Sequence, residues 1–91
     1  MDPTFSFKIL SPKAQILDEE VVSIVAPGEA GYLGVLANHA PLISTMKDGE
    51  LKVKFSGGTE RRFRITGGIL RVAGNNAVLL TESIEELGAA G

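Results

Sequence analysis

The sequence predicts an all-β protein, a sandwich or barrel of roughly eight to ten short strands. Apolar and polar residues alternate with a period of two in segment after segment, as in strands that bury one face. Glycine and proline, 11 and 4 of the 91 residues, interrupt this alternation at intervals that suit short strands joined by turns. We therefore expect one domain over residues 1–87, followed by a frayed tail over residues 88–91.

Composition excludes several classes of function. A net charge of -2 does not suit a nucleic-acid-binding protein, which carries a basic surface. The absence of cysteine excludes disulfides, thiolate zinc sites, iron–sulfur clusters and cysteine nucleophiles. With 44% hydrophobic and 22% charged residues, the chain has the balance of a folded globular domain.

The first half of the chain predicts strands separated by turns. Residues 5–9 alternate and form a first strand that ends near Pro12. An acidic turn over residues 18–20 precedes a β-branched segment over residues 21–26, which we expect to be buried on both faces. Residues 28–41 are rich in glycine, and we interpret them as a shaped loop region that holds only short strand fragments.

The segments that follow predict a turn and then a hairpin. Residues 42–46 form a strand, and residues 47–49 form a turn in which Gly49 supplies a positive φ. Residues 50–55 then alternate again.

The register of the hairpin follows from its two apolar sets, which must share one face. Leu51 and Val53 alternate with lysines, and Phe63 and Ile65 alternate with arginines. A three-residue loop over residues 57–59 pairs Val53 with Phe63 and Leu51 with Ile65. A two-residue loop would place the two sets on opposite faces, so we predict the three-residue loop.

Four cations occupy the other face of this hairpin: Lys52, Lys54, Arg62 and Arg64. The predicted register places Lys52 opposite Arg64 and Lys54 opposite Arg62, which costs a few tenths of a kcal/mol. One interpretation is a solvated face balanced by nearby glutamates, namely Glu50 and Glu60. The other is a basic contact face for an acidic surface of a neighbouring protein.

The last third of the chain predicts a second hairpin and no helical domain. After the break at residues 67–68, strands over 69–73 and 77–81 flank a tight turn at residues 74–76. Residues 82–87 hold one helical turn at most, which leaves no room for a C-terminal helical domain.

No group of residues predicts catalysis, a metal site or a bound cofactor. His39 is the single histidine and has no cysteine to join it in a metal site. The carboxylates of residues 18–20 are adjacent rather than held at the separation that hydrolysis requires. The glycines at 28, 31 and 34 do not match a phosphate-binding loop. We expect a protein that is not an enzyme and binds no nucleotide.

An alternative function starts from Lys47. Met46 and Lys47 stand in a predicted turn between two strands, and this pair resembles the Met-Lys-Met hairpin of biotinyl and lipoyl carrier domains. Asp48 replaces the second methionine of that motif. The alternative is therefore a carrier domain modified on Lys47.

Residues 27–42, which read PGEAGYLGVLANHAPL, closely resemble the N-terminal domain of the F-type ATP synthase epsilon subunit. The likeness continues through residues 47–49, 67–72 and 77–81, so that it covers nearly the whole chain. The resemblance implies a flattened β-sandwich of ten strands. This architecture agrees with the strand count that the alternation predicts independently.

The resemblance also implies a function. The chain would be a non-catalytic rotor subunit at the foot of the central stalk, where it binds the gamma subunit and the c-ring and couples proton flow to ATP synthesis. A ring-facing role is implied for Glu29, Ala30, Gly31 and Tyr32. Contact with gamma or the ring is implied for His39, Pro41 and Leu42.

Most members of that family continue into a C-terminal helical hairpin that restrains ATP hydrolysis, and this sequence stops at Gly91. We expect a short form that keeps assembly and coupling and lacks the helical brake with its nucleotide site. The expected location is peripheral, on the cytoplasmic face of a bacterial plasma membrane. The alternative is the stromal face of a thylakoid membrane.

Overall fold

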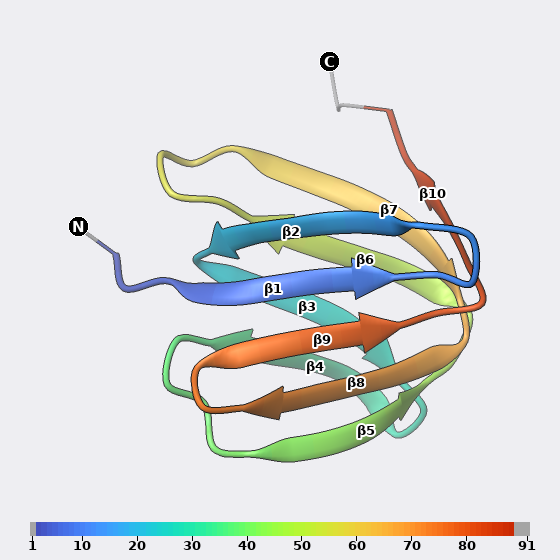
Figure 1. Ribbon diagram of the computed structural model, residues 1–91, viewed down its shortest axis with the longest axis horizontal. Helices are drawn as coiled ribbons and strands as arrows, with labels where there is room; N and C mark the ends of the chain where they lie inside the picture. Colours follow the sequence, from blue (N-terminus) through green and yellow to red (C-terminus); the bar gives the residue numbers. More distant parts are fainter. Residues whose placement is uncertain (1, 89–91) are drawn as a thin grey trace.

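Ten β-strands are present in residues 2–88, the part of the chain that the computed structural model describes (Figure 1). They are β1 (Phe5–Leu10), β2 (Gln15–Val21), β3 (Ser23–Gly28), β4 (Gly31–Leu36), β5 (Leu42–Met46), β6 (Gly49–Lys54), β7 (Glu60–Thr66), β8 (Gly68–Ala73), β9 (Asn76–Leu80) and β10 (Ser83–Glu86). Residues 2–88 contain no helix. The prediction of an all-β sandwich is confirmed, whereas residues 89–91 of the expected tail lie outside the described residues.

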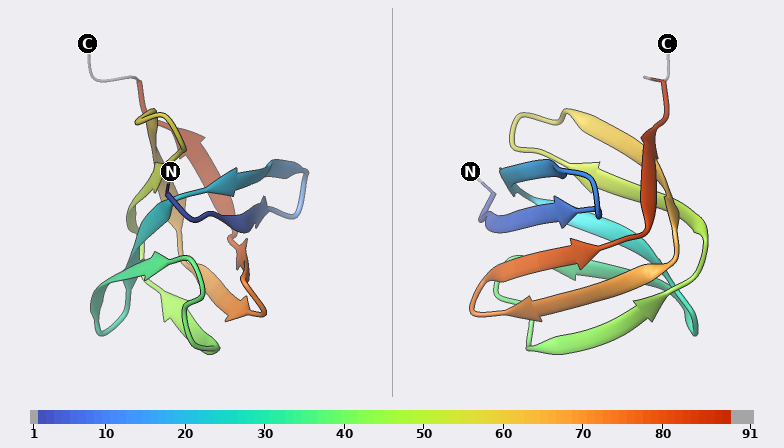
Figure 2. Two further views of the ribbon diagram at one scale, coloured as in Figure 1. Left: turned by 90° about the vertical axis from the view of Figure 1, so that its left-hand side faces the viewer. Right: turned by 45° about the vertical axis from the view of Figure 1, so that its right-hand side comes forward.

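The strands form one curled sheet in the order β10-β7-β6-β3-β5-β8-β9-β1-β2, with β4 on the other side of β3. The pairs are antiparallel except for β1 with β9. β3 joins two layers, because residues 23–25 pair with β6 while Gly28 meets Met46 of β5. Figures 1 and 2 show the curl, with β4 behind β8 and β9 in the first view.

The core lies between these two layers and consists of the side chains that alternate inward. The largest fully buried ones are Phe5, Phe7, Phe63, Ile9, Ile24, Leu51, Ile65, Leu70 and Leu79. Each such side chain contributes about 1.5–3 kcal/mol relative to an exposed position. Both layers supply them, so neither layer is stable without the other.

The hairpin of β6 and β7 has the predicted faces but not the predicted register. Leu51, Val53, Phe63 and Ile65 are all buried on one face, as expected. The structure pairs Leu51 with Phe63 and Val53 with Arg61, so the predicted pairing is wrong by two residues. A shift of two residues leaves every side chain on its face, because the strand period is two.

The position of the loop explains this shift. The loop has three residues, as predicted, but it spans 56–58 instead of 57–59. The Phe55 N–H donates to the Thr59 carbonyl at 2.7 Å and closes it. Gly57 and Gly58 both have φ of +93°, a conformation that favours glycine. The two glycines therefore occupy the last two loop positions.

Three expectations for the first half of the chain differ from the structure. Residues 18–20 belong to β2 and pair with β1, so they do not form an acidic turn. β3 is buried on one face only, because Val25 is 38% exposed on the other. The segment over residues 28–41 also holds more regular structure than a shaped loop, since six of its residues form β4.

The end of the chain forms a strand where one helical turn at most was expected. Residues 83–86 pair with β7 as β10, with Ile84 opposite Ile65. The Thr81 hydroxyl donates to the Gly67 carbonyl at 2.8 Å and lies 3.2 Å from the Ser83 carbonyl. This anchored bend directs the chain from β9 to the edge of β7, where strand pairing overrides the weak helical spacing.

Gly68 provides a test of the packing between β8 and β9. A Cβ at Gly68 would lie against the Leu80 carbonyl oxygen and 3.1 Å from the Thr81 Cα, and φ there is +132°. Gly31 has the same φ with nothing within 4 Å, which makes it a matched control. We expect Gly31→Ala to cost about 1–2 kcal/mol from backbone strain alone. Gly68→Ala should cost at least about 2 kcal/mol more.

Urea unfolding of the two variants, followed by circular dichroism, measures this difference. Equal losses of unfolding free energy in Gly68→Ala and Gly31→Ala would show that the close approach of β8 to the end of β9 does not require glycine.

Candidate partner-binding surface

The hairpin of β3 and β4 contains the residues Glu29 to Tyr32 that the sequence singled out. Its tip is a two-residue loop, Glu29 and Ala30, between the paired glycines Gly28 and Gly31. The local backbone geometry requires glycine at both positions. A Cβ on Gly28 would lie 2.8 Å from the Gly31 carbonyl oxygen, and Gly31 has φ of +132°.

Three hydrogen bonds fix this tip to the neighbouring layer. The Glu29 N–H donates to the Thr45 carbonyl at 3.0 Å, and the Thr45 hydroxyl donates to Glu29 Oε1 at 2.6 Å. The Lys47 N–H donates to the Pro27 carbonyl at 2.9 Å. These hydrogen bonds restrict the motion of the hairpin backbone that carries the exposed side chains.

Tyr32 is 61% exposed on the outer face of the first strand after this tip. Its hydroxyl lies 3.8 Å from the position that a Gly49 Cβ would take, and that Cβ would lie 2.9 Å from Pro27 Cβ. Gly49 does not have a positive φ, so the prediction that it supplies one is wrong. Glycine is required there because Pro27 packs closely against the start of β6.

Two further exposed apolar side chains share this outer face with Tyr32. Val25 is 38% exposed and Leu36 is 63% exposed. A hollow of about 360 Å³ lies beside them and is lined by Val25, Tyr32, Glu50 and Lys52. A tyrosine with an apolar ring and a polar tip beside such a hollow is typical of protein interfaces.

The second group of predicted contact residues lies at the opposite end of β4. Asn38 has φ of +63°, and its N–H donates to Asn75 Oδ1 at 2.7 Å, so this loop rests on the turn between β8 and β9. His39 Nδ1 donates to the Ala40 carbonyl at 2.7 Å. Pro41 is exposed and Leu42 is half-buried. β4 separates the two groups by about 17 Å at 3.3 Å per residue, so they are two surfaces.

The four predicted cations do share one face, but their cross-strand neighbours differ from the predicted ones. Lys52, Lys54, Arg62 and Arg64 share the outer face of β6 and β7, but the pairs Lys52–Arg64 and Lys54–Arg62 do not form. Lys54 lies opposite Glu60, Arg64 lies opposite Glu50, and Lys52 lies opposite Arg62. Arg62 forms an ion pair with Glu50 at 3.2 Å. The observed register thus places a glutamate beside three of the four cations.

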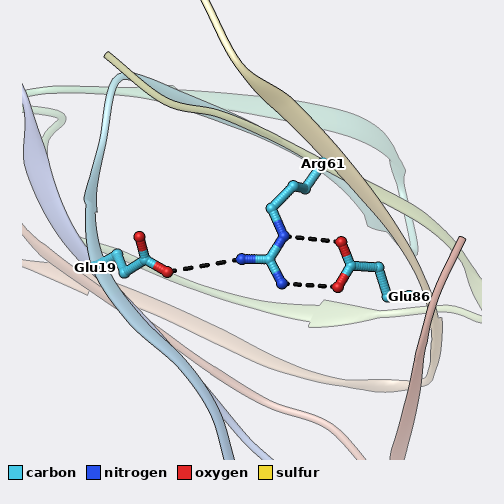
Figure 3. A network of polar contacts seen from close by, with 3 residues as sticks. All are labelled: Glu19, Arg61 and Glu86. Atoms are coloured by element: carbon cyan, nitrogen blue, oxygen red, sulfur yellow. Dashed lines mark hydrogen bonds and ion pairs between the residues drawn. The ribbon is translucent and has the colours of Figure 1, made fainter. Parts of the chain in front are cut away.

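Sequence reasoning missed a polar network around Arg61 (Figure 3). Arg61 donates two hydrogen bonds to the Glu86 carboxylate, at 2.8 and 2.7 Å, and its Nη1 lies 3.6 Å from Glu19 Oε2. The guanidinium carbon also lies 5.2 Å from the centre of the Phe63 ring. The hydrogen bonds from Arg61 lower the pKa of Glu86, and those to Glu86 raise the pKa of Arg61.

This network joins the two ends of the curled sheet. Glu19 belongs to β2 and Glu86 to β10, which are the first and last strands of the order, and Arg61 lies on β7 beside β10. The sequence signal is a charge at a position where the alternation predicts an apolar residue. Arg61 shares the inward face of Phe63, and Glu19 shares the face of Val21.

The structure does not support the carrier alternative at Lys47. β5 pairs with β8 and β6 pairs with β7, so Lys47 lies in a crossover between layers instead of a hairpin. Within residues 2–88, no three histidine, cysteine or acidic side chains are grouped so that they could hold a metal ion. The same residues include no helix long and apolar enough to span a membrane.

The fold and its exposed hairpin define a β-sandwich of the kind that assembles with other proteins, and comparisons with known proteins agree. Residues 4–87 match the family model described as "ATP synthase, Delta/Epsilon chain, beta-sandwich domain". The ATP synthase epsilon chain of Chlorobaculum tepidum is 39% identical over 91% of this chain and 94% of its own length. That of Dichelobacter nodosus is 39% identical over 90% of this chain, which spans 57% of that longer relative.

Solved structures show the same fold. A chain in the OSCP/F1/c-ring assembly of the Euglena gracilis mitochondrial ATP synthase superposes with a TM-score of 0.88. It is 25% identical to this chain, and the match covers 94% of this chain and 56% of the other. The chain therefore belongs to the ATP synthase delta/epsilon family. The resemblance found in the sequence is confirmed.

The Arg61 network predicts a stability that depends on pH. We expect Arg61→Leu to lower the free energy of unfolding by about 1 kcal/mol at pH 7, because the partners are partly exposed. Glu86 has a lowered pKa in the folded state, so its contribution is present above the ordinary value of 4.5 and is lost as pH falls through the folded value. The difference between wild type and variant should therefore shrink in acid.

Arg71→Leu is the control, because Arg71 is exposed and no ion pair to it occurs in residues 2–88. Urea titrations at pH 7 and at pH 3 measure both variants. A loss in Arg61→Leu that is unchanged in acid would mean that the arginine acts through packing on Phe63 alone.

Proposed function

We propose that this chain is a non-catalytic subunit of the ATP synthase rotor that links the gamma subunit to the c-ring and transmits torque between them. The observation that carries the proposal is the hairpin of β3 and β4, which holds Tyr32 exposed on a backbone anchored to the neighbouring layer. Torque transmission requires such a surface, because a contact on a mobile loop would yield under load. Family membership supplies the assembly in which this surface acts.

The two surfaces at the ends of β4 suit a linking role. Glu29, Ala30, Gly31 and Tyr32 form the contact with the ring. His39, Pro41 and Leu42, at the other end, contact gamma or the ring. A single sandwich with contacts at two separated places can join two partners without chemistry of its own. The face of Lys52, Lys54, Arg62 and Arg64 is a further contact for an acidic partner surface.

The proposed location follows from these partners. The chain is held at a membrane through the ring, on the cytoplasmic face of a bacterial plasma membrane. Support comes from the relatives, since the epsilon chains of Chlorobaculum tepidum and Dichelobacter nodosus are bacterial. The stromal face of a thylakoid membrane is the alternative.

Tyr32→Ala tests the ring-side contact. The side chain is 61% exposed, so we expect the unfolding free energy of the isolated chain to change by less than about 1 kcal/mol. Binding to ATP synthase from which this chain has been stripped should weaken about tenfold, because exposed aromatics at interface centres contribute most.

Ile43→Ala is the matched control. Ile43 is 73% exposed on the outer face of the other layer, where we propose no contact. Equal binding of Tyr32→Ala and wild type, or an equal loss in Ile43→Ala, would contradict the assignment of the contact to the hairpin.

The function itself is tested by a tagged pull-down from a mild-detergent extract of the source membranes. Recovery of the gamma, catalytic and ring subunits, identified by mass spectrometry, is the expected result. ATP hydrolysis should be present in the eluate and absent from the chain alone. A folded, tagged chain that recovers none of these subunits would refute the proposal.

A further inference from the structure

Three strands of the sheet pair with a neighbour along one side only: β2, β10 and β4. An unpaired strand edge invites pairing with another chain, and proteins block it with charges, bulges or short strands. β2 carries the acidic residues 18–20 and a register shift between Ile9 and Leu10 of its partner. β10 has four residues and includes Glu85 and Glu86. Both edges are therefore protected.

β4 has none of these protections. Its six residues read GYLGVL, with no charge and no proline. Its pairing with β3 runs without a register shift from Ser23 opposite Leu36 to Gly28 opposite Gly31. A regular, uncharged edge is the arrangement expected of a strand that another strand covers.

Backbone geometry shows which groups of β4 face this open edge. The Pro27 carbonyl accepts from the Lys47 N–H and so points away from β4, and proline has no N–H. Pro27 and Tyr32 are therefore a pair without mutual hydrogen bonds. Because such pairs alternate along an antiparallel ladder, Tyr32, Gly34 and Leu36 direct their backbone groups outward.

Most of these outward groups have no partner within residues 2–88. The Leu36 carbonyl accepts from the His39 N–H at 3.2 Å. The N–H groups of Tyr32, Gly34 and Leu36 and the carbonyls of Tyr32 and Gly34 form no hydrogen bond in this part of the chain. Tyr32 and Leu36 are 61% and 63% exposed, so the edge is accessible.

β5 is also largely unpaired on one side, but it presents fewer free backbone groups to a partner strand than β4 does. It meets β3 only at Met46, and the same alternation leaves Ile43 and Thr45 facing outward. The Thr45 carbonyl already accepts from the Glu29 N–H. β4 therefore carries the longer unsatisfied edge.

We infer that β4 accepts an extended strand from a partner subunit of the ATP synthase, which adds to this sheet next to β4. The inference rests on the proposed function for the assembly that supplies the strand. A side chain opposite Gly34 would lie between Tyr32 and Leu36, so the partner strand carries an apolar residue there. Backbone hydrogen bonds would fix the orientation of the added strand relative to β4, which suits a contact that transmits torque.

Charge indicates a partner of different sequence. Lys52 and Lys54 are exposed on the same outer face, and neither forms an ion pair within residues 2–88. Because β3 and β4 lie between these lysines and the added strand, an acidic surface of the partner that extends from that strand over this outer face would complement them. A second copy of this chain would bring the same uncharged strand and the same lysines, and would leave both cations unpaired.

Gly34→Pro tests the edge directly. Proline removes the outward N–H and places its ring where the partner strand would bond, while the bonds between β3 and β4 stay, because Gly34 does not direct its N–H to β3. Gly34→Ala is the matched control, since its Cβ would meet nothing nearer than the Ile24 carbonyl oxygen at 4.0 Å. Compared with wild type, binding to ATP synthase stripped of this chain should weaken at least about tenfold for Gly34→Pro and less than about twofold for Gly34→Ala.

Amide hydrogen exchange supplies a readout that does not depend on the variants folding. Exchange proceeds in the complex and in the free wild-type chain, and each amide is read after quenching. The amides of Tyr32, Gly34 and Leu36 should become protected on binding. Those of Leu33 and Val35 already bond to β3 and should change least.

The outcomes separate this inference from the proposed function. A wild-type chain that does not bind the stripped enzyme refutes the proposed function. Binding of wild type with no alternating protection, or equal binding of folded Gly34→Pro, refutes the added strand and leaves the function standing. Alternating protection in the isolated chain that rises with its concentration would identify a second copy as the occupant and overturn the partner strand.

Discussion

The structure depends on one strand that serves both layers of the sandwich. β3 pairs with β6 over residues 23–25 and meets β5 at Gly28, while its other side carries β4 throughout. Its inward side chains, Ile24 and Ala26, are fully buried in the shared core. Because short strands are marginal by themselves, this connection makes the two layers one cooperative sheet. Pro27 is tolerated in this strand because its missing N–H faces away from β4.

The three edge strands of the sheet differ in the charges that they carry. Arg61 donates two hydrogen bonds to Glu86 of the edge strand β10 and lies close to Glu19 of the edge strand β2, so both of these edge strands carry charged side chains (Figure 3). Charged side chains on an edge strand discourage its pairing with other chains. β4 lacks such charges and lies beside the exposed Tyr32 and Leu36. Two of the three edge strands thus carry protecting features and the third does not, which is the basis of the strand addition inferred above.

Glycine has two different physical functions around the hairpin of β3 and β4. Gly31 has a φ that other residues rarely adopt, and it permits the two-residue tip. Gly28 and Gly49 are required for space, since a Cβ at either would lie within 3.0 Å of a neighbour. These close approaches, with the bonds from Thr45 and Lys47, hold the tip against the rest of the molecule. The same local sequence thus determines both the shape of this hairpin and its attachment to the neighbouring layer.

The sequence by itself determined the all-β class, the inward faces of the β6–β7 hairpin and the family, because alternation and the motif over residues 27–42 are local patterns. The sequence also predicted two groups of contact residues, and the structure places these groups at opposite ends of β4. Only the tertiary structure decided the register of β6 with β7, the strand at residues 83–86 and the Arg61 network. A register shift of two residues conserves every face, so the local pattern does not distinguish the two registers. The charges of Glu19 and Arg61 at inward positions are visible in the sequence, but these two side chains meet only after the sheet has curled.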